Sequence, residues 1–152
     1  MNSGSKRLGF RLAKEEDRER LFAWRNLPES IAASKDGKKV LRFHHDDWFS
    51  KLLKEQPSRK LWIAELQGGE VAVGWIRAEP VEKQYELSWL IDSQFRTQGF
   101  GSEMLTFATE SLRPYPCRAW IRSTNLSSQK MAQKCGYQSL SREMDFELWQ
   151  KI

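Results

Sequence analysis

The chain has 152 residues, the length of one ordinary domain, and a domain of this size buries roughly 70% of its extended-chain surface. Hydrophobic residues make up 39% and charged residues 30%, with seven Trp and eight Phe, which excludes a disordered chain. No segment approaches the roughly 20 consecutive apolar residues of a membrane span, so we expect no membrane partner. Lys and Arg outnumber Asp and Glu by 25 to 20, but they are dispersed, which disfavours nucleic acid as a partner.

The first ten residues, MNSGSKRLGF, hold no apolar run that could serve as a signal peptide, so we expect a cytoplasmic protein. Cys117 and Cys135 are the only cysteines, and neither lies in a C-x-x-C or Cys/His pattern. We therefore predict neither a disulfide framework nor a metal site. The adjacent histidines His44 and His45 would face different directions on a helix, which makes a poor pair of metal ligands.

The N-terminal third is predicted to form a strand and two helices. Residues 7–13 indicate a short strand, and residues 14–26 indicate a helix with an acidic first turn that closes at Pro28. Residues 27–43 are polar and contain a Lys-Asp-Gly-Lys turn signal, which predicts a loop with room for a short helix. Residues 44–56 carry apolar side chains four apart and predict an amphipathic helix.

The period changes to that of strands at residue 59. Residues 59–66 and 71–80 predict a hairpin, and residues 84–92 predict a third strand beside it. The later elements are a helix at 102–112, a strand at 118–124, a short helix at 125–136, a strand that Tyr137 begins, and a last strand at 145–152. We predict one α/β domain with a mixed sheet over residues 1–152.

The loop between the third strand and the following helix has the form of an anion site. In the segment IDSQFRTQGFGSEML, Arg96, Gly99 and Gly101 stand between a strand and a helix start. The first amides of a helix lack intrahelical partners and attract anions, and glycines there admit a phosphate and permit a positive φ. The Gly-Lys-Ser/Thr ending of a P-loop is missing, and so is the first glycine of the dinucleotide fingerprint directly after a strand, which disfavours a nucleoside triphosphate or NAD.

The order of three segments gives the chain a family resemblance. The strand ELSWLID, the R-x-x-G-x-G loop and the later segment NLSSQKMAQKCGY together resemble the Gcn5-related N-acetyltransferases, whose pyrophosphate loop has the form Q/R-x-x-G-x-G/A. The resemblance covers the chain well from about residue 70 onward and loosely before it. It implies an α/β (α+β) GNAT fold with acceptor-side helices at about 14–56 and an acyl-CoA-binding core at about 59–152. The implied sheet is mixed, mostly antiparallel and twisted, with six to seven strands splayed between the fourth and fifth, and helices on both faces.

The resemblance also assigns the donor site, for acetyl-CoA without a metal. It implies that the main chain of Leu90 and Ile91 pairs with the pantetheine arm. Asn125 and Ser128 would contact the cofactor at the start of the next helix, and Lys130 could reach its phosphates. The residues implied to hold the pyrophosphate are Arg96, Thr97, Gln98, Gly99, Phe100, Gly101 and Ser102.

Glu86 is the candidate general base. Alternation places Glu86, Ser88 and Leu90 on one face of the strand, and a carboxylate there is costly to bury unless it is paired or tuned. In related enzymes a glutamate at this place often accepts the amine proton, directly or through water. The resemblance implies the backbone N–H of Ile91 as the oxyanion donor. The usual acid, a tyrosine in the helix after the asparagine, is replaced here by Ala132.

The acceptor residues are predicted from the N-terminal third. Trp24, Arg25 and Asn26, followed by His45 and Trp48, resemble the subgroup that acetylates nucleotide-activated amino sugars, including the pseudaminic acid pathway enzyme of flagellin glycosylation. Aromatic faces suit a sugar or uracil ring, a guanidinium suits a diphosphate, and His and Asn suit hydroxyls. Trp24 and Trp48 also fall on apolar helical stripes, where large aromatics are usually core residues.

The sequence leaves other functions open. The first alternative is a protein acetyltransferase of the ribosomal-protein type, acting on an N-terminal amine or a lysine. The second is an acyl-CoA-binding sensor without catalysis, which the missing tyrosine would suit. The expected partner is otherwise a small-molecule amine, and the oligomeric state, a homodimer included, is open. We expect direct transfer, since no cysteine lies in an activated setting.

Overall fold

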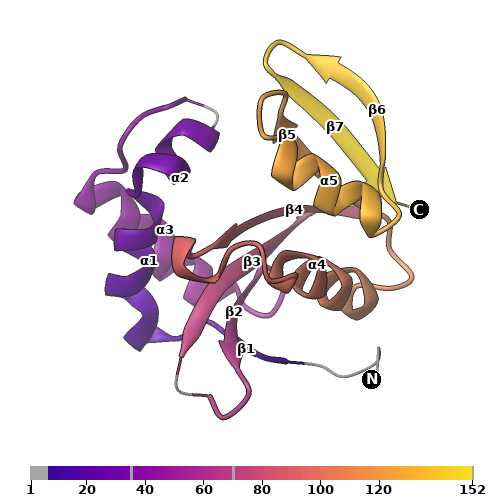
Figure 1. Ribbon diagram of the computed structural model, residues 1–152. Helices are drawn as coiled ribbons and strands as arrows, with labels where there is room; N and C mark the ends of the chain where they lie inside the picture. The colour runs from indigo at the N-terminus through magenta and orange to yellow at the C-terminus, as the bar shows by residue number, and fades with distance from the viewer. Residues whose placement is uncertain (1–6, 35, 70, 152) are drawn as a thin grey trace.

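The computed structural model describes residues 7–34, 36–69 and 71–151, and in these ranges it shows a seven-stranded sheet with helices on both faces (Figure 1). The order of strands across the sheet is β1-β2-β3-β4-β5-β7-β6. The strands are β1 (Leu8–Leu12), β2 (Lys60–Leu66), β3 (Ala72–Val81), β4 (Gln84–Ile91), β5 (Cys117–Arg122), β6 (Gln138–Glu143) and β7 (Phe146–Lys151).

The sheet is split between its fourth and fifth strands. β4 pairs antiparallel with β3 along its whole length, but it pairs with the parallel strand β5 only at Tyr85↔Cys117 and Glu86↔Arg118. All other neighbouring strands are antiparallel. Residues 87–91 therefore lack a ladder partner on the β5 side, and the sheet opens there, as the resemblance implied.

The helices divide between the two faces, and each face has its own core. On one face Met104 and Ala108 pack with Leu87, and on the other Phe49 packs with Leu90. Burying an aliphatic or aromatic side chain of this size stabilises the fold by about 1.5–3 kcal/mol. The helices are α1 (Arg18–Arg25), α2 (Pro28–Ala33), α3 (Arg42–Glu55), α4 (Phe100–Ser111) and α5 (Leu126–Lys134), with short 3₁₀ turns η1 (Glu15–Asp17) and η2 (Ser93–Phe95).

Two predicted elements differ from the structure near the N-terminus. The first predicted helix consists of the turn η1 followed by α1, which ends at Arg25. Pro28 does not merely close that helix, because it occupies the first turn of α2, where a missing N–H costs nothing. None of the described helices is both long and apolar enough to cross a membrane.

Candidate active site

The unpaired edge of β4 presents main-chain groups to the opening of the sheet. Asp92 N donates to Val73 O at 2.8 Å, so Gly74 and Ile91 form a non-hydrogen-bonded pair of the β3–β4 ladder. Because the bonding direction alternates along a strand, the amides of Trp89 and Ile91 point away from β3 and toward the opening. An extended ligand can pair with this edge as an added strand does.

The loop after β4 directs helix amides to the same place. Thr97 and Gly99 have positive φ angles of 63° and 82°, and they turn the chain into α4 with Gly99 at its N-cap. The N–H groups of residues 100–102 lack intrahelical acceptors and stand at the positive end of the helix dipole. The first turn of α4 is therefore suited to an anion beside the end of β4.

Glycine is needed at the two positions of this loop for different structural reasons. Gly99 adopts a left-handed conformation that side chains strain. A Cβ on Gly101 would lie 2.4 Å from Met131 Sδ, so this glycine lets α5 pack against α4. We expected both glycines to make room for a phosphate, and for Gly101 the contact with Met131 supplies a packing reason in addition.

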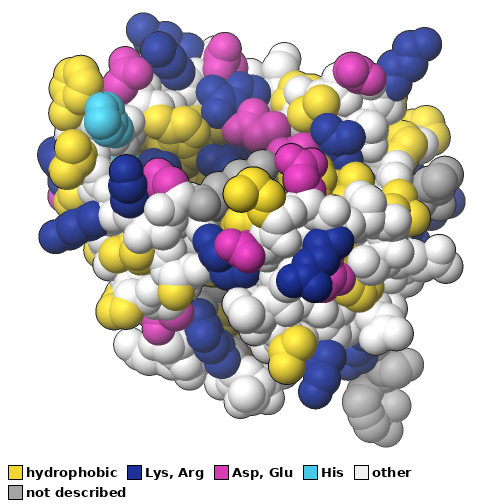
Figure 2. All heavy atoms as spheres, turned by 90° about the horizontal axis from the view of Figure 1, so that it is seen from above, with side chains coloured by type: hydrophobic (Ala, Val, Ile, Leu, Met, Phe, Trp, Pro, Cys, Tyr) yellow, Lys and Arg dark blue, Asp and Glu magenta, His cyan; other side chains and the backbone are white. Residues whose placement is uncertain are grey.

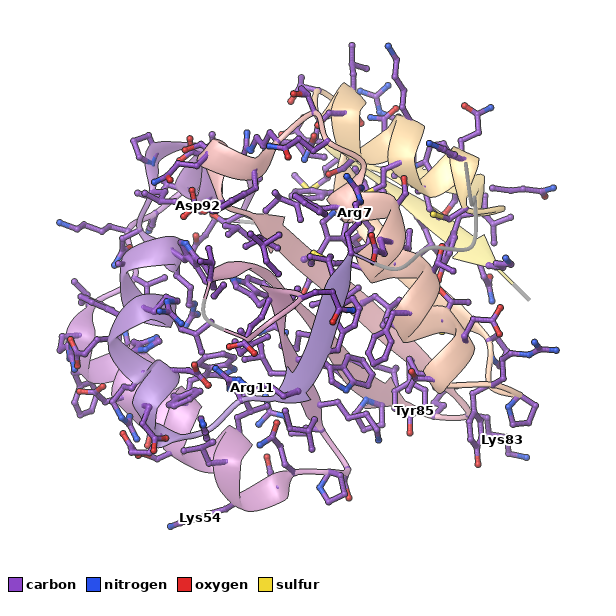
Figure 3. All side chains as sticks on the ribbon, turned by 60° about the horizontal axis from the view of Figure 1, so that its bottom comes forward. Arg7, Arg11, Lys54, Lys83, Tyr85 and Asp92 are labelled. Carbon is purple, nitrogen blue, oxygen red and sulfur yellow. The ribbon has the colours of Figure 1, made fainter. Side chains whose placement is uncertain are left out.

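Arg7 is a residue of this loop region that the sequence did not single out. Its Nη2 donates to Gln98 O at 2.5 Å, and its guanidinium lies 4.3 Å from the centre of the Phe100 ring. Glu103 accepts hydrogen bonds from the backbone N–H of Arg7 at 2.8 Å and of Leu8 at 2.9 Å, which directs its charge toward β1 (Figure 3). Sequence separation of more than 90 residues hid this contact.

Arg96 folds back over the end of β4. Its Nε donates to Ile91 O at 3.3 Å, so a guanidinium stands beside the open strand edge. The side chain is exposed and can move to meet an anion. Arg96 and Arg7 together give the loop two cations from distant parts of the sequence.

The start of α5 contributes a second group of polar atoms. Asn125 is the N-cap, and its Oδ1 accepts from Ser128 N at 3.2 Å. Ser128 Oγ accepts from Trp89 Nε1 at 3.2 Å, so it joins α5 to β4. Lys130 is exposed, whereas Ala132 is fully buried. The position that corresponds to the family's tyrosine therefore offers no proton donor.

Tyr137 does not replace the missing acid. Its side chain is buried, and its hydroxyl lies 2.6 Å from Thr109 Oγ1 on the far side of the helix layer. Burial raises its pKa well above the ordinary value. Its role is packing in the core beneath α4, directly before β6.

Glu86 stands where β4 and β5 part. Its side chain is 32% exposed, and its Oε2 accepts from Arg118 Nε at 3.2 Å. No other described residue makes a hydrogen bond to the carboxylate, so Oε1 remains available to a ligand or a water. Glu86 and Ser88 share the face of β4 on which Leu90 packs against α3, as the alternation predicted. Arg118 was not identified from the sequence.

Trp24 and Asn26 are engaged by the protein itself. Trp24 is 5% exposed, and its Nε1 donates to Asp92 Oδ2 at 2.9 Å. Asn26 forms a pair of hydrogen bonds with the backbone of Val40, at 2.9 and 2.6 Å. Trp24 thus fastens α1 to the end of β4, and Asn26 fixes the loop before α3, in place of the direct substrate contacts expected from the sequence.

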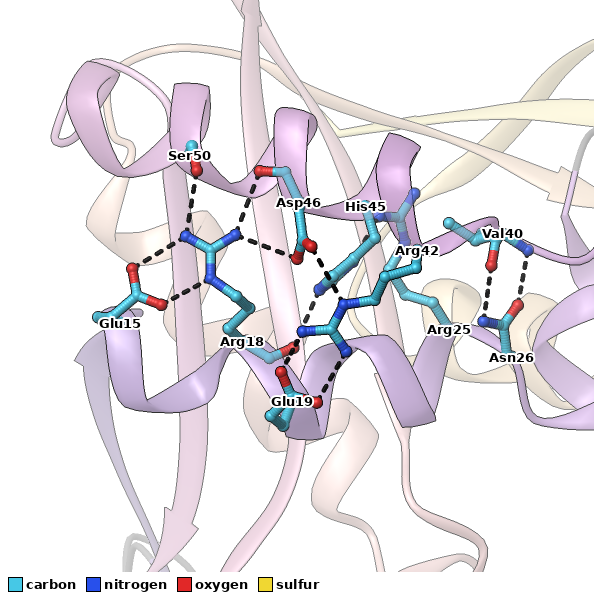
Figure 4. A network of polar contacts seen from close by, with 10 residues as sticks. All are labelled: Glu15, Arg18, Glu19, Arg25, Asn26, Val40, Arg42, His45, Asp46 and Ser50. Atoms are coloured by element: carbon cyan, nitrogen blue, oxygen red, sulfur yellow. Dashed lines mark hydrogen bonds and ion pairs between the residues drawn. The ribbon is translucent and has the colours of Figure 1, made fainter.

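His45 lies beside Arg25 and holds its side chain in position (Figure 4). His45 is fully buried, and its Nε2 lies 2.9 Å from Arg18 O, which can only accept, so Nε2 carries the proton. Nδ1 is then free to accept from Arg25 Nη1 at 3.1 Å. Burial lowers the pKa of His45, which favours this neutral form. In the structure both ring nitrogens of His45 contact the protein itself, so its contact with a substrate hydroxyl stays a prediction.

The two helices that carry these residues are clamped together by charge pairs. Arg18 binds Glu15, Asp46 and the hydroxyl of Ser50, and Arg42 binds Glu19 as well as Asp46 (Figure 4). Exposed ion pairs contribute little individually, about 0–1 kcal/mol, but the network fixes α1 against α3. The network therefore holds α1 and α3 in a fixed relative position on the proposed acceptor side.

Trp48 lies between two guanidinium groups. The Arg25 Cζ atom is 4.3 Å from the centre of the indole ring, and the Arg77 Cζ atom is 5.6 Å from it. Burial, with the nearby charge of Arg77, lowers the pKa of Arg25 to about 10. Seen from above, the surface is hollowed, and hydrophobic and basic side chains lie in the recess (Figure 2).

The end of β5 closes the hollow on its other side. Arg122 donates to Ser34 O at the end of α2, and its guanidinium lies 4.6 Å from the centre of the Phe146 ring. A shallow cavity of about 200 Å³ lies beside Phe146. Its lining residues are Trp120, Glu143, Met144, Asp145 and Phe146. Among the described residues, no group of three or more His, Cys, Asp or Glu could hold a metal ion.

Comparisons with known proteins agree with this geometry. A domain from Methanocaldococcus jannaschii superposes with a TM-score of 0.85 at 18% identity over 97% of this chain and 99% of that one. RimL, a ribosomal-protein α-N-acetyltransferase solved with coenzyme A, gives 0.81 at 16% identity over 97% and 95% of the chains. Spermidine N-acetyltransferase from Vibrio cholerae, solved with CoA and spermine, gives 0.78 at 9% identity over 95% and 93%. No curated protein sequence matches the chain.

The sequence itself carries the family assignment. Residues 7–138 match the family model described as an acetyltransferase (GNAT) domain. This match covers most of the chain. The split sheet, the glycine-containing turn into α4 and the exposed amides of β4 are the structural counterparts of that match. The chain belongs to the GNAT acetyltransferase family and is an acetyl-CoA-dependent N-acetyltransferase.

Proposed function

We propose that this enzyme transfers an acetyl group directly from acetyl-CoA to the primary amine of a nucleotide-linked amino sugar, in the biosynthesis of a surface polysaccharide or glycan. One observation carries the proposal. Glu86 stands at the closed end of the split between β4 and β5, with the anion-binding turn of α4 toward one side and the Arg25–Trp48 hollow toward the other. Donor and acceptor can therefore meet at one carboxylate.

The donor is held mainly by main-chain groups. The outward amides of Trp89 and Ile91 pair with the pantetheine arm, and the amides of residues 100–102 bind the pyrophosphate with Arg96 beside them. Acetyl-CoA supplies a thioester, whose carbonyl is the electrophile. The N–H of Ile91 points into the opening and is placed to donate to the oxyanion that forms on that carbonyl.

Glu86 receives the proton of the acceptor amine, directly or through one water. Arg118 donates to its Oε2, which leaves Oε1 free to face the reacting nitrogen. The thiolate departs without a side-chain acid at position 132, and a thiol is acidic enough to leave in this way. Attack and departure occur within one ternary complex, so no acetylated protein forms.

The acceptor is recognised by aromatic and basic side chains. The indole of Trp48 offers a face for a sugar or a base, and Arg25 offers a cation for the diphosphate. His45 holds Arg25 in place, and Asn26 fixes the loop before α3 through the backbone of Val40.

A panel of acceptors tests the proposal. The purified protein is incubated with acetyl-CoA and either UDP-linked amino sugars, free polyamines or peptides with free N-termini, and CoA release and product mass are measured. We expect the nucleotide-linked amino sugar to be the best acceptor. Acetylation of peptides alone would assign the protein to the ribosomal-protein type, and CoA binding without turnover on any amine would indicate a sensor.

A further inference from the structure

Three buried hydrogen-bond donors on β3 and β4 have no hydrogen-bond partner among the residues that the structure describes. They are Trp75 Nε1, Arg77 Nε and Ser88 Oγ. Arg77 pairs with Ser88 in the ladder, and Trp75 lies two residues along β3 on the same face. Buried donors without partners are rare and costly in folded proteins, about 1–3 kcal/mol each. Adjacent ones indicate a missing acceptor of hydrogen bonds.

The positive charge beside these donors is only partly compensated. No described carboxylate lies within 4 Å of Arg25, whose hydrogen-bond partner is the neutral His45. Glu79 Oε2 is 3.7 Å from Arg77 Nε, but both Glu79 oxygens already accept from Arg59 at 2.7 Å. Two guanidinium groups thus share one hollow around Trp48, and an anion between them would offset their repulsion.

The location relates this cluster to the reacting centre. Ser88 follows Glu86 by two residues on the same face of β4, which is a separation of roughly 7 Å along a strand. An anionic group at Ser88 and Arg77 would therefore lie about that far from an amine at Glu86. The spacing matches a small molecule that carries both groups, such as an amino sugar with a phosphate on its ring.

We propose that Arg25, Arg77, Ser88 and Trp75 form an oxyanion subsite, which selects acceptors that carry a phosphate or carboxylate roughly 7 Å from the reacting amine. This inference rests on the proposed transfer to an amine at Glu86. Arg25 and Arg77 supply the charge, and the Trp75 N–H and Ser88 hydroxyl supply neutral donors that fix the oxyanion's orientation. Acceptors that lack the anion leave these donors unpaired, which is the strongest form of discrimination in a buried site.

Matched acceptors test the selectivity. Rates of acetylation are compared within two pairs of acceptors, glucosamine with glucosamine 6-phosphate and cadaverine with lysine, and the members of each pair differ by one anionic group. We expect kcat/KM to rise on the order of 10- to 100-fold with the anion. In Arg77→Met and Ser88→Ala the ratio of anionic to neutral acceptor falls toward one. Equal rates for both members of every pair would overturn the proposal.

Binding of inorganic phosphate gives a readout that needs no turnover. The protein is first saturated with CoA, which fills the turn of α4, and its Tm is then measured with phosphate against chloride at equal ionic strength. We expect phosphate to raise the Tm of the wild type and of the surface control Arg113→Met, but not of Arg77→Met. An equal rise in both variants, or none in the wild type, would refute the subsite.

The two experiments separate the subsite from the transferase proposal. A phosphate effect that needs Arg77, together with no acetylation of any amine, would keep the subsite and refute transfer. Acetylation of amino-sugar nucleotides without any preference for the anion would do the reverse.

Discussion

The donor side and the acceptor side of this molecule are built in different ways. The proposed donor site uses main-chain amides of two neighbouring segments, residues 89–91 and 100–102, whose conformation follows from a strand end and a glycine turn. The proposed acceptor site uses side chains from α1, α3, β3 and β4, which only the tertiary fold brings together. A site made of main chain can be recognised from a local motif, whereas a site made of distant side chains cannot.

The largest expected effect falls where the two sides meet. Glu86→Gln removes the proposed proton acceptor, and we expect kcat to fall on the order of 100-fold or more with little change in CoA affinity. Steady-state kinetics and calorimetric CoA titration measure the two quantities. Glu110→Gln, which removes an equally ion-paired carboxylate on the surface, serves as control.

Full kcat/KM in Glu86→Gln at all pH values would remove Glu86 from the mechanism. The donor and acceptor sides would then not meet at Glu86. A fall that is equal in the Glu110→Gln control would indicate a loss of fold instead.

The donor side is tested by its helix packing. Gly101→Ala places a Cβ against Met131 Sδ, and we expect a loss of about 1–3 kcal/mol in the free energy of unfolding and weaker CoA binding. Met131→Ala in the same chain removes the clash and should restore most of the CoA affinity. Denaturant unfolding and calorimetric CoA titration measure the two quantities. An affinity that stays low in the double variant would show that the glycine is needed for the phosphate itself.

The proposed donor side could be located from local sequence signals for this physical reason. Arg96, Gly99 and Asn125 stand at fixed offsets from strand and helix ends, so their positions followed from local signals alone. Arg7, Arg77 and Arg118 were missed because the residues that they contact lie on other elements. In the case of Arg7, its partner Gln98 is 91 residues away in the sequence. For His45 and Asn26 the sequence predicted direct contacts with the substrate, because no local pattern distinguishes a buried side chain that positions another from one that binds the substrate.

The acceptor side predicts a pH dependence of stability. The pKa of His45 is lowered in the fold, so between its folded and unfolded pKa values the unfolded chain binds more protons. The stability that neutral His45 contributes is therefore present above about pH 6.5 and is lost as the pH falls through the folded pKa. Urea unfolding between pH 5 and 8 measures it. We expect His45→Gln to flatten this slope and the exposed His44→Gln to retain it.

The smallest expected effect tests whether the two sides are coupled. Asp92 accepts from Gln94 N at the start of the donor loop with one oxygen and from Trp24 Nε1 of α1 with the other, so it joins both sides (Figure 3). Trp24→Phe keeps the packing and removes one hydrogen bond to a charged group, worth about 1.5–3 kcal/mol before relaxation. We expect a severalfold rise in KM for both acetyl-CoA and acceptor. Trp48→Phe, which lies only on the acceptor side, should raise the acceptor KM alone, and the same pattern in both variants would show that Asp92 does not couple the sites.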